Sequence, residues 1–339
     1  MPTSDELEEI TAVADDSARF ARRVRRLDET AMEQLDADVG RLAEDYLRRP
    51  LITTFRRVAG LRADVFSMLD ERHPLDQERH LYLVAGKLCA LLAHASADLG
   101  HPAEADTHAR TALVCAELIN DGPLRAYTRW VQSLIAYWRG DYRSAADIAA
   151  LGRDHATTGT AMLRLTSQEA RALAAAGLTG EFAGAAALAL TCRDAATGEP
   201  DVEAGVFRFN PGKAAYYAAE AHTAVGDFPR AMVEATEAIT LLEAEAVPSP
   251  ELIAAARLDL AAAHIAAGDI DGAADPLREV LRMAPQHRTV PIIGRAVAAA
   301  KRLNESDAPV AAELAAEAEV FTVYPAGPAA LPSADPAEG

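Results

Sequence analysis

The sequence predicts an all-α fold built from stacked helix–turn–helix pairs, and three observations carry this prediction. Half of the 339 residues are hydrophobic, but alanine dominates and aromatic residues make up only 5%. Alanine has the highest helix propensity and lets helices pack closely. Valine and isoleucine are sparse and show no alternation of the kind that marks strands. Besides the alanine-rich composition and the lack of strand-like alternation, the third observation is a short glycine-containing phrase that recurs five times along the chain.

In each recurring phrase an alanine follows a glycine by five residues. The glycines are spaced by 40, 40, 46 and 42 residues: Gly100, Gly140, Gly180, Gly226 and Gly268. Glycine readily adopts the left-handed conformation that ends a helix. An acidic residue then caps the next helix in four phrases: Asp141, Glu181, Asp227 and Asp269. The alanine is small enough for the two helices to cross, so each phrase predicts one helix pair.

The first 75 residues form a predicted N-terminal helical segment, 1–75. Apolar residues recur at helical spacing over 3–26 and 29–48. Pro50 ends the second of these helices, and a third helix is predicted over 52–70.

Residues 76–304 form the predicted repeat array, in which helices pair across each turn glycine. Start signals support this arrangement, because Pro123, Pro211 and Pro250 each fall at the beginning of a predicted helix. The longest predicted loop is 197–210, which accounts for the 46-residue step. A helix over 288–304 is expected to close the array, since terminal repeats need a polar cap.

The region 305–339 is predicted to hold a C-terminal helix followed by a tail. From Pro325 onward the composition is rich in proline, alanine and serine, which is typical of disorder.

Composition argues against several classes of function. The net charge of −18 disfavours direct nucleic-acid binding, which depends on lysine and arginine displacing counterions. A basic run at 19–26 is interpreted as a solvated helix face. The three cysteines form neither a disulfide framework nor a zinc site. The acidic N-terminus does not resemble a signal peptide, and no membrane span is expected, so the predicted location is cytoplasmic.

Catalytic and metal-binding motifs are not found in the sequence. There is no His-Glu-x-x-His, no paired cysteine ligands, no phosphate-cradling glycine loop and no Gly-x-Ser-x-Gly. We therefore expect a protein that is not an enzyme, with no cofactor and no metal.

The recurring phrase resembles the turn of the tetratricopeptide (TPR) motif. The last copy matches best, with Leu260, Ala273, Leu277 and Pro285 at the expected distances from Gly268. TPR units usually have about 34 residues, so the longer units here require extended helices or linkers. The resemblance implies a right-handed α-solenoid of TPR-like helix pairs, with N-terminal helices and a C-terminal capping helix.

A longer set of phrases resembles actinobacterial TPR-containing transcriptional regulators of the Xre type. The phrases cover parts of residues 7–300: 10–20, 35–39, 81–86, 105–110, 136–142 and 211–217. Those regulators usually carry an N-terminal helix-turn-helix domain before the TPR region. No compact helix-turn-helix segment is found here, so the resemblance implies the sensor half of the family's function and not the DNA-binding half.

A ligand site is expected on the concave side of the solenoid, which the first helix of each pair lines. Both tryptophans of the protein lie on the helix before Gly140. Candidate ligand-binding residues on the first helices are Lys87, His94, Tyr127, Trp130, Tyr137, Arg164, Gln168, Arg171, Lys213 and Tyr217.

We expect five of these candidates, Trp130, Tyr137, Arg171, Lys213 and Tyr217, to face one concavity. Such a cationic, aromatic-walled groove would suit a carboxylate or phosphate, for example a peptide C-terminus. Phe207 and Phe209 could cover it as a lid. Plain packing between repeats and ordinary solvated faces are the competing interpretations.

Two main hypotheses of function follow. The first is a regulatory or sensor module that binds a peptide or small signalling ligand in its groove and acts through a protein partner. The second is an assembly adaptor that holds proteins together without a small ligand, and an enzyme built on the solenoid comes third. The sequence leaves the oligomeric state open, a homodimer included.

Overall fold

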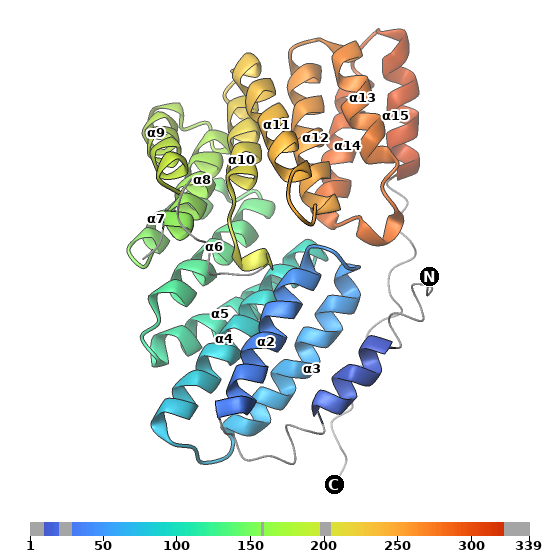
Figure 1. The fold of residues 1–339 in the computed structure, drawn as a ribbon. Coiled ribbons are helices and arrows are strands. Elements are labelled where there is room, and N and C mark those ends of the chain that lie inside the picture. Colours follow the sequence, from blue (N-terminus) through green and yellow to red (C-terminus); the bar gives the residue numbers. More distant parts are fainter. Residues whose placement is uncertain (1–9, 20–28, 157–158, 197–204, 322–339) are drawn as a thin grey trace.

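The computed structural model describes residues 10–19, 29–156, 159–196 and 205–321. Within these ranges the chain is helical and contains no strand, which confirms the predicted all-α solenoid. After a helix over 10–19, seven helix pairs follow one another (Figure 1). They are α2 (Glu29–Tyr46) with α3 (Leu51–Leu69), α4 (Leu75–Asp98) with α5 (Pro102–Leu118), α6 (Gly122–Trp138) with α7 (Tyr142–Arg153), α8 (Gly159–Ala175) with α9 (Thr179–Ala196), α10 (Pro211–Ala224) with α11 (Phe228–Glu243), α12 (Pro250–Ala266) with α13 (Ile270–Leu281), and α14 (Val290–Leu303) with α15 (Pro309–Phe321).

Two short 3₁₀ helices lie between pairs: η1 (Gly205–Phe207) and η2 (Pro285–His287). The predicted helix over 3–26 is described only for 10–19, and the predicted tail lies outside the described residues.

Four of the five predicted turns use the expected glycine. Gly100, Gly140, Gly226 and Gly268 have φ between 79° and 82°, the left-handed region. Three of the predicted acidic caps are also confirmed: Asp141, Asp227 and Asp269. In each of them a side-chain oxygen accepts a hydrogen bond from the backbone N–H of the residue three positions later.

The third predicted turn is wrong by three residues. Gly177, with φ of 73°, makes this turn, while Gly180 lies inside α9 and Glu181 is no cap. The reason is local packing: when Gly177 turns, the N–H of Leu178 donates to the carbonyl of Leu173 at 3.0 Å, and the two leucines pack in one cluster. This is the hydrophobic contact that accompanies a Schellman helix end.

The segment 288–304 is not the extra closing helix that its position suggested. It forms α14, the first helix of a further pair with α15, and Arg295 on α14 points toward the centre of the molecule.

The solenoid curves far enough for its two ends to meet. A methyl group built on Gly100, in the α4–α5 turn, would lie 3.1 Å from the side chain of Val290 at the start of α14. A cavity of about 240 Å³ lies between the end of α2 and the start of α12, lined by Tyr46 and Glu251 among others. The first helices of the pairs therefore surround a common centre.

Helix α4 is long and apolar enough to cross a membrane by length and composition. However, 78% of its most apolar window is buried inside the protein, as expected for the core helix of a solenoid.

Candidate ligand site at the centre of the superhelix

The first helix of each of the seven pairs sends side chains toward the centre. We call this group of side chains the central chamber. Its members are Tyr46 on α2, His94 and Asp98 on α4, Tyr127, Trp130 and Tyr137 on α6, Arg164, Gln168 and Arg171 on α8, Lys213, Tyr217 and Glu220 on α10, Glu251 and Asp259 on α12, and Arg295 on α14. A small cavity of about 50 Å³, the central cavity, lies among them.

Arg171, which is only 1% exposed, lies in the middle of one cluster of chamber side chains. Its guanidinium carbon lies 3.9 Å from the ring centroid of Tyr137 and 4.3 Å from that of Tyr217. Its Nε lies 3.3 Å from Oε2 of Glu220, and the hydroxyl of Tyr137 donates to Oε1 of the same carboxylate at 2.7 Å. A cation between two aromatic faces is thus held by one shared carboxylate.

A second cation–aromatic group lies beside the first. The guanidinium of Arg164 lies 4.8 Å from the ring centroid of Tyr127 and 5.2 Å from that of Trp130. The ammonium of Lys213 lies 4.9 Å from the ring centroid of Trp130 on α6. The five residues predicted to share one concavity, Trp130, Tyr137, Arg171, Lys213 and Tyr217, are therefore close together.

The segment before α10 completes the wall of the chamber. Phe207 packs edge-on against Tyr127, with ring centroids 4.8 Å apart, and Phe209 packs against Tyr217 at 5.5 Å. Both phenylalanines are buried against the chamber in the described structure, and their role as a lid stays a prediction. Gly205, in the left-handed region, makes this possible, because a side chain there would overlap the carbonyl of Ala43 on α2.

The predicted cationic, aromatic-walled groove also receives carboxylates from three helices. Its cations are Arg164, Arg171, Lys213 and Arg295, and its acids are Asp98, Glu220, Glu251 and Asp259. Arg295 forms an ion pair with Asp259 and lies 3.8 Å from Glu220. The chamber therefore carries charges of both signs.

The acids differ in ionisation. Burial raises the pKa of Asp98 well above its usual value, and the neighbouring Glu251 raises it further. Burial also raises the pKa of Glu251. Although burial alone would raise the pKa of Glu220, Arg171 and Arg295 lower it, so this carboxylate stays ionised.

His94 lies between the α2 and α6 aromatic residues. Its ring stacks on Tyr46 at 4.8 Å and meets Trp130 edge-on at 5.0 Å. Burial lowers its pKa well below the usual value, with Lys213 and Arg164 adding to the effect, so the imidazole is neutral. The hydroxyl of Tyr46 donates to Asp98 at 2.6 Å.

Besides the indole N–H of Trp130, the side chains of Gln168 and Lys213, buried on α8 and α10, make no hydrogen bond with the residues that the structure describes. The side chain of Gln168 is fully buried, and neither its Oε1 nor its Nε2 has a hydrogen bond. Lys213 is 5% exposed, and its Nζ makes no hydrogen bond or ion pair. Burial lowers the pKa of Lys213 to about 8, with Arg164 contributing, against the opposing effect of Glu251 and Asp98.

The remaining predicted residue, Lys87, lies at the margin. It is half-buried on α4, with its ammonium 5.7 Å from the ring centroid of Phe207. Six chamber residues were not among the candidate ligand-binding residues: Tyr46, Asp98, Glu220, Glu251, Asp259 and Arg295. Two of them could have been found from the sequence by helical spacing. Asp98 lies one helical turn after His94, and Glu220 lies one helical turn after Tyr217.

The described residues contain no group of three or more histidine, cysteine, aspartate or glutamate side chains placed to hold a metal ion. The groups that the chamber offers to a ligand are cations over aromatic rings, acids whose pKa burial raises, and a buried amide without a hydrogen bond to the described residues.

Comparison with known proteins supports the fold. No protein-family model matches the chain, and no curated protein matches it. A solved structure of a Rap protein complexed with the competence and sporulation factor is similar, with a TM-score of 0.54 and 14% identity. The match covers 85% of this chain and 78% of the Rap chain. At this identity the likeness concerns the fold, a TPR-like helical solenoid, and does not extend to the Xre-type regulators in particular.

Proposed function

We propose that the chain is a regulatory or sensor module that binds a peptide or small signalling ligand in the central chamber and acts through a protein partner in the cytoplasm. The similar Rap protein was solved with its competence and sporulation factor, which makes ligand binding by such a solenoid a reasonable model. The proposal itself depends on the chamber of this chain.

Two observations carry the proposal. The buried amide of Gln168 has no hydrogen bond with the described residues. The buried ammonium of Lys213 lies over the rings of Trp130 and Phe209 and forms no ion pair with the residues that the structure describes. A buried polar group without a hydrogen bond costs about 1–3 kcal/mol, and an unpaired charge costs more. Folded proteins leave few such groups, and those that persist call for an explanation such as a bound molecule. A ligand carboxylate accepting from Lys213 and an amide pairing with Gln168 would remove both costs.

Binding would require the solenoid to open. The central cavity holds about 50 Å³, whereas sites for drug-sized ligands measure about 300–1,000 Å³. The described form would then be the closed member of a two-state equilibrium, held by the contacts of Glu220 with Arg171 and Arg295. A ligand that binds the open form would shift the population toward it and so change the outer surface that a partner meets.

Exposed apolar residues on the outer helices would supply the partner surface. Val114 and Leu118 are neighbours on one face of α5, and Leu151 on α7 and Val233 on α11 are exposed as well. Isolated exposed apolar residues are common, whereas a contiguous apolar patch marks a contact with another protein, and Val114 and Leu118 would belong to such a patch. This same surface supports the adaptor hypothesis.

The test uses the full chain and the low-molecular-mass fraction of an extract of the cells that produce it. Native mass spectrometry should show a complex with one small molecule or peptide, lost in Lys213→Met and retained in Lys301→Met, an exposed lysine on α14. Retention of the complex by Lys213→Met would place the ligand elsewhere. Absence of any complex would leave the adaptor hypothesis as the better one.

A further inference from the structure

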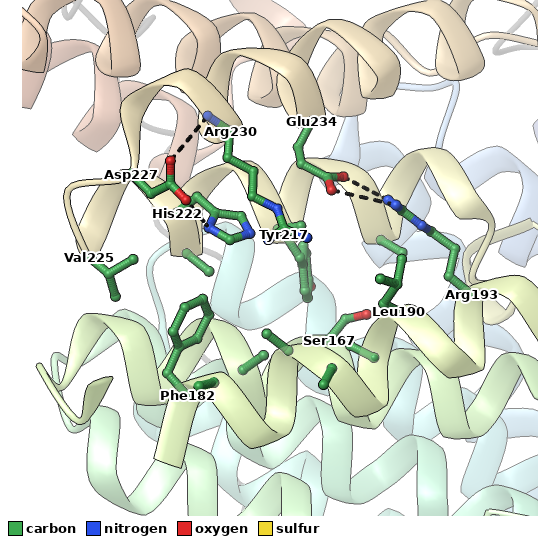
Figure 2. A pocket seen from close by; sticks show the side chains of 18 residues that line it. Ser167, Phe182, Leu190, Arg193, Tyr217, His222, Val225, Asp227, Arg230 and Glu234 are labelled. Carbon is green, nitrogen blue, oxygen red and sulfur yellow. Dashed lines mark hydrogen bonds and ion pairs between the residues drawn. The ribbon is translucent and has the colours of Figure 1, made fainter. Parts of the chain in front are cut away.

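A second hollow lies between the α8–α9 pair and the α10–α11 pair (Figure 2). We call it the α9 slot. Its volume is about 390 Å³, within the range of small-ligand sites. Alanine is the commonest residue of its walls, with Ala183, Ala186 and Ala187 from α9 and Ala214 and Ala218 from α10.

The slot exists because α9 packs mainly on α8 and makes few contacts with α10. From Phe182 to Cys192 α9 has no charged residue, and it is apolar on all sides, yet only Phe182 and Ala185 are buried. A helix that is apolar all round is normally covered on all sides. The apolar surface that faces α10 is therefore unsatisfied in the described structure.

Charged and polar side chains lie at both ends of the slot. At one end Arg193 forms an ion pair with Glu234 at 2.7 Å. At the other, His222, Asp227 and Arg230 lie together, as Figure 2 shows. The two arginines and two acids balance, so the slot has no net charge to attract an ion.

His222 gives the slot one polar group that is not satisfied. The residue is 8% exposed, and its Nδ1 has no hydrogen bond, because the nearest carboxylate oxygen, on Asp227, is 3.7 Å away. Burial lowers the pKa of His222, and Arg230 lowers it further, so the ring is neutral. This nitrogen, Nδ1, faces Asp227 at one end of the slot, where a small hydroxyl or amide group can complete its hydrogen bonding.

We propose that the α9 slot binds a small, uncharged aliphatic molecule with one hydrogen-bonding head group. The chain would lie along the alanines of α9 and the head would pair with His222. The stretch from Phe182 to Arg193 is about 16 Å long at 1.5 Å per residue, enough for a chain of medium length.

A helix of a partner protein is the competing occupant of this apolar surface, and the variants described below separate it from a small molecule. The slot and the central cavity are separate sites that share one wall, Tyr217, so the proposal does not depend on a ligand in the chamber.

The test is a calorimetric titration of the full chain with 1-hexanol and 1-octanol, with octanoate as the charged comparator. We expect saturable 1:1 binding of 1-octanol. Each added methylene should tighten binding about fourfold, from its transfer free energy. Octanoate should bind more weakly than 1-octanol, because a carboxylate loses its hydration in an alanine-rich slot and the protein is strongly acidic.

Matched variants locate the site. Ala187→Phe fills the slot from an exposed position and should abolish binding, while Leu188→Phe, exposed on the same helix but not lining the slot, should leave it unchanged. His222→Leu should weaken 1-octanol binding about threefold to tenfold, the worth of one hydrogen bond.

Three results would overturn the proposal: no saturable binding of 1-octanol, equal binding by Ala187→Phe, or tighter binding of octanoate. A dimer of the wild type that Ala187→Phe dissociates, without alcohol binding, would assign the slot to a protein contact instead.

Discussion

At the scale of single residues, the chamber changes the ionisation of Lys213. Its pKa in the folded protein is about 8, below the ordinary 10.5, chiefly because burial disfavours the charged form. Between these two values the unfolded chain binds more protons at this lysine than the folded chain does. The free energy of unfolding should therefore rise with pH across this window, and the penalty for burying the charged lysine should be fully present below pH 8.

Comparison with Lys213→Met isolates this effect from other titrating groups. The variant should be more stable than the wild type at pH 7.5, and its advantage should shrink by roughly 2 kcal/mol by pH 10. Urea unfolding at a series of pH values measures the difference. A difference independent of pH would show that Lys213 has an ordinary pKa and is not desolvated.

At the scale of the helix pair, the turns and crossings were predictable from the sequence because they depend on local chemistry. Four turn glycines and three acidic caps stand where expected, since a left-handed turn needs glycine and a helix start needs an oxygen acceptor. The third turn was misplaced because two glycines, Gly177 and Gly180, lie within one turn of helix, and packing of Leu178 on Leu173 decides between them.

The crossing alanines give a prediction at this scale. Ala145 and Ala231 are fully buried where paired helices cross, and Ser133 donates to the carbonyl of Ala145 at 2.6 Å. Ala145→Leu and Ala231→Leu should each destabilise the protein by about 1–3 kcal/mol through overpacking. Ala103→Leu, exposed on α5, should change little in the same thermal melts. Equal melting temperatures for all three variants would contradict the crossing geometry.

At the scale of the whole molecule, the sequence predicted only in part that the first helices of the seven pairs surround a common centre. Helical spacing correctly placed ten residues on these helices, because solenoids expose the first helix of each pair to one side. It could not show that the superhelix curves until α12 and α14 face α4 and α6. That curvature brings Glu251, Asp259 and Arg295 to the centre and turns an expected open, cationic groove into a closed chamber of mixed charge.

Glu220 is predicted to hold this closed form. Glu220→Ala leaves Arg171 buried without its carboxylate and removes one neighbour of Arg295, which should cost about 3–5 kcal/mol. Small-angle X-ray scattering should show a larger radius of gyration for this variant than for the wild type. Glu243→Ala, which breaks the exposed pair with Arg257, should cost about 1 kcal/mol or less and leave the radius unchanged. An unchanged radius in Glu220→Ala would mean that other contacts close the solenoid.

The central claim is that the unpartnered polar groups of the chamber serve a ligand and not the fold. The most direct test is the free energy of unfolding of the double variant Gln168→Met and Lys213→Met, measured in urea at neutral pH without ligand. Replacing buried polar groups by apolar groups of similar volume is often neutral or stabilising by about 1–4 kcal/mol. The account predicts a double variant at least as stable as the wild type, whereas a loss of about 2 kcal/mol or more would show that Gln168 and Lys213 stabilise the fold and would contradict the claim.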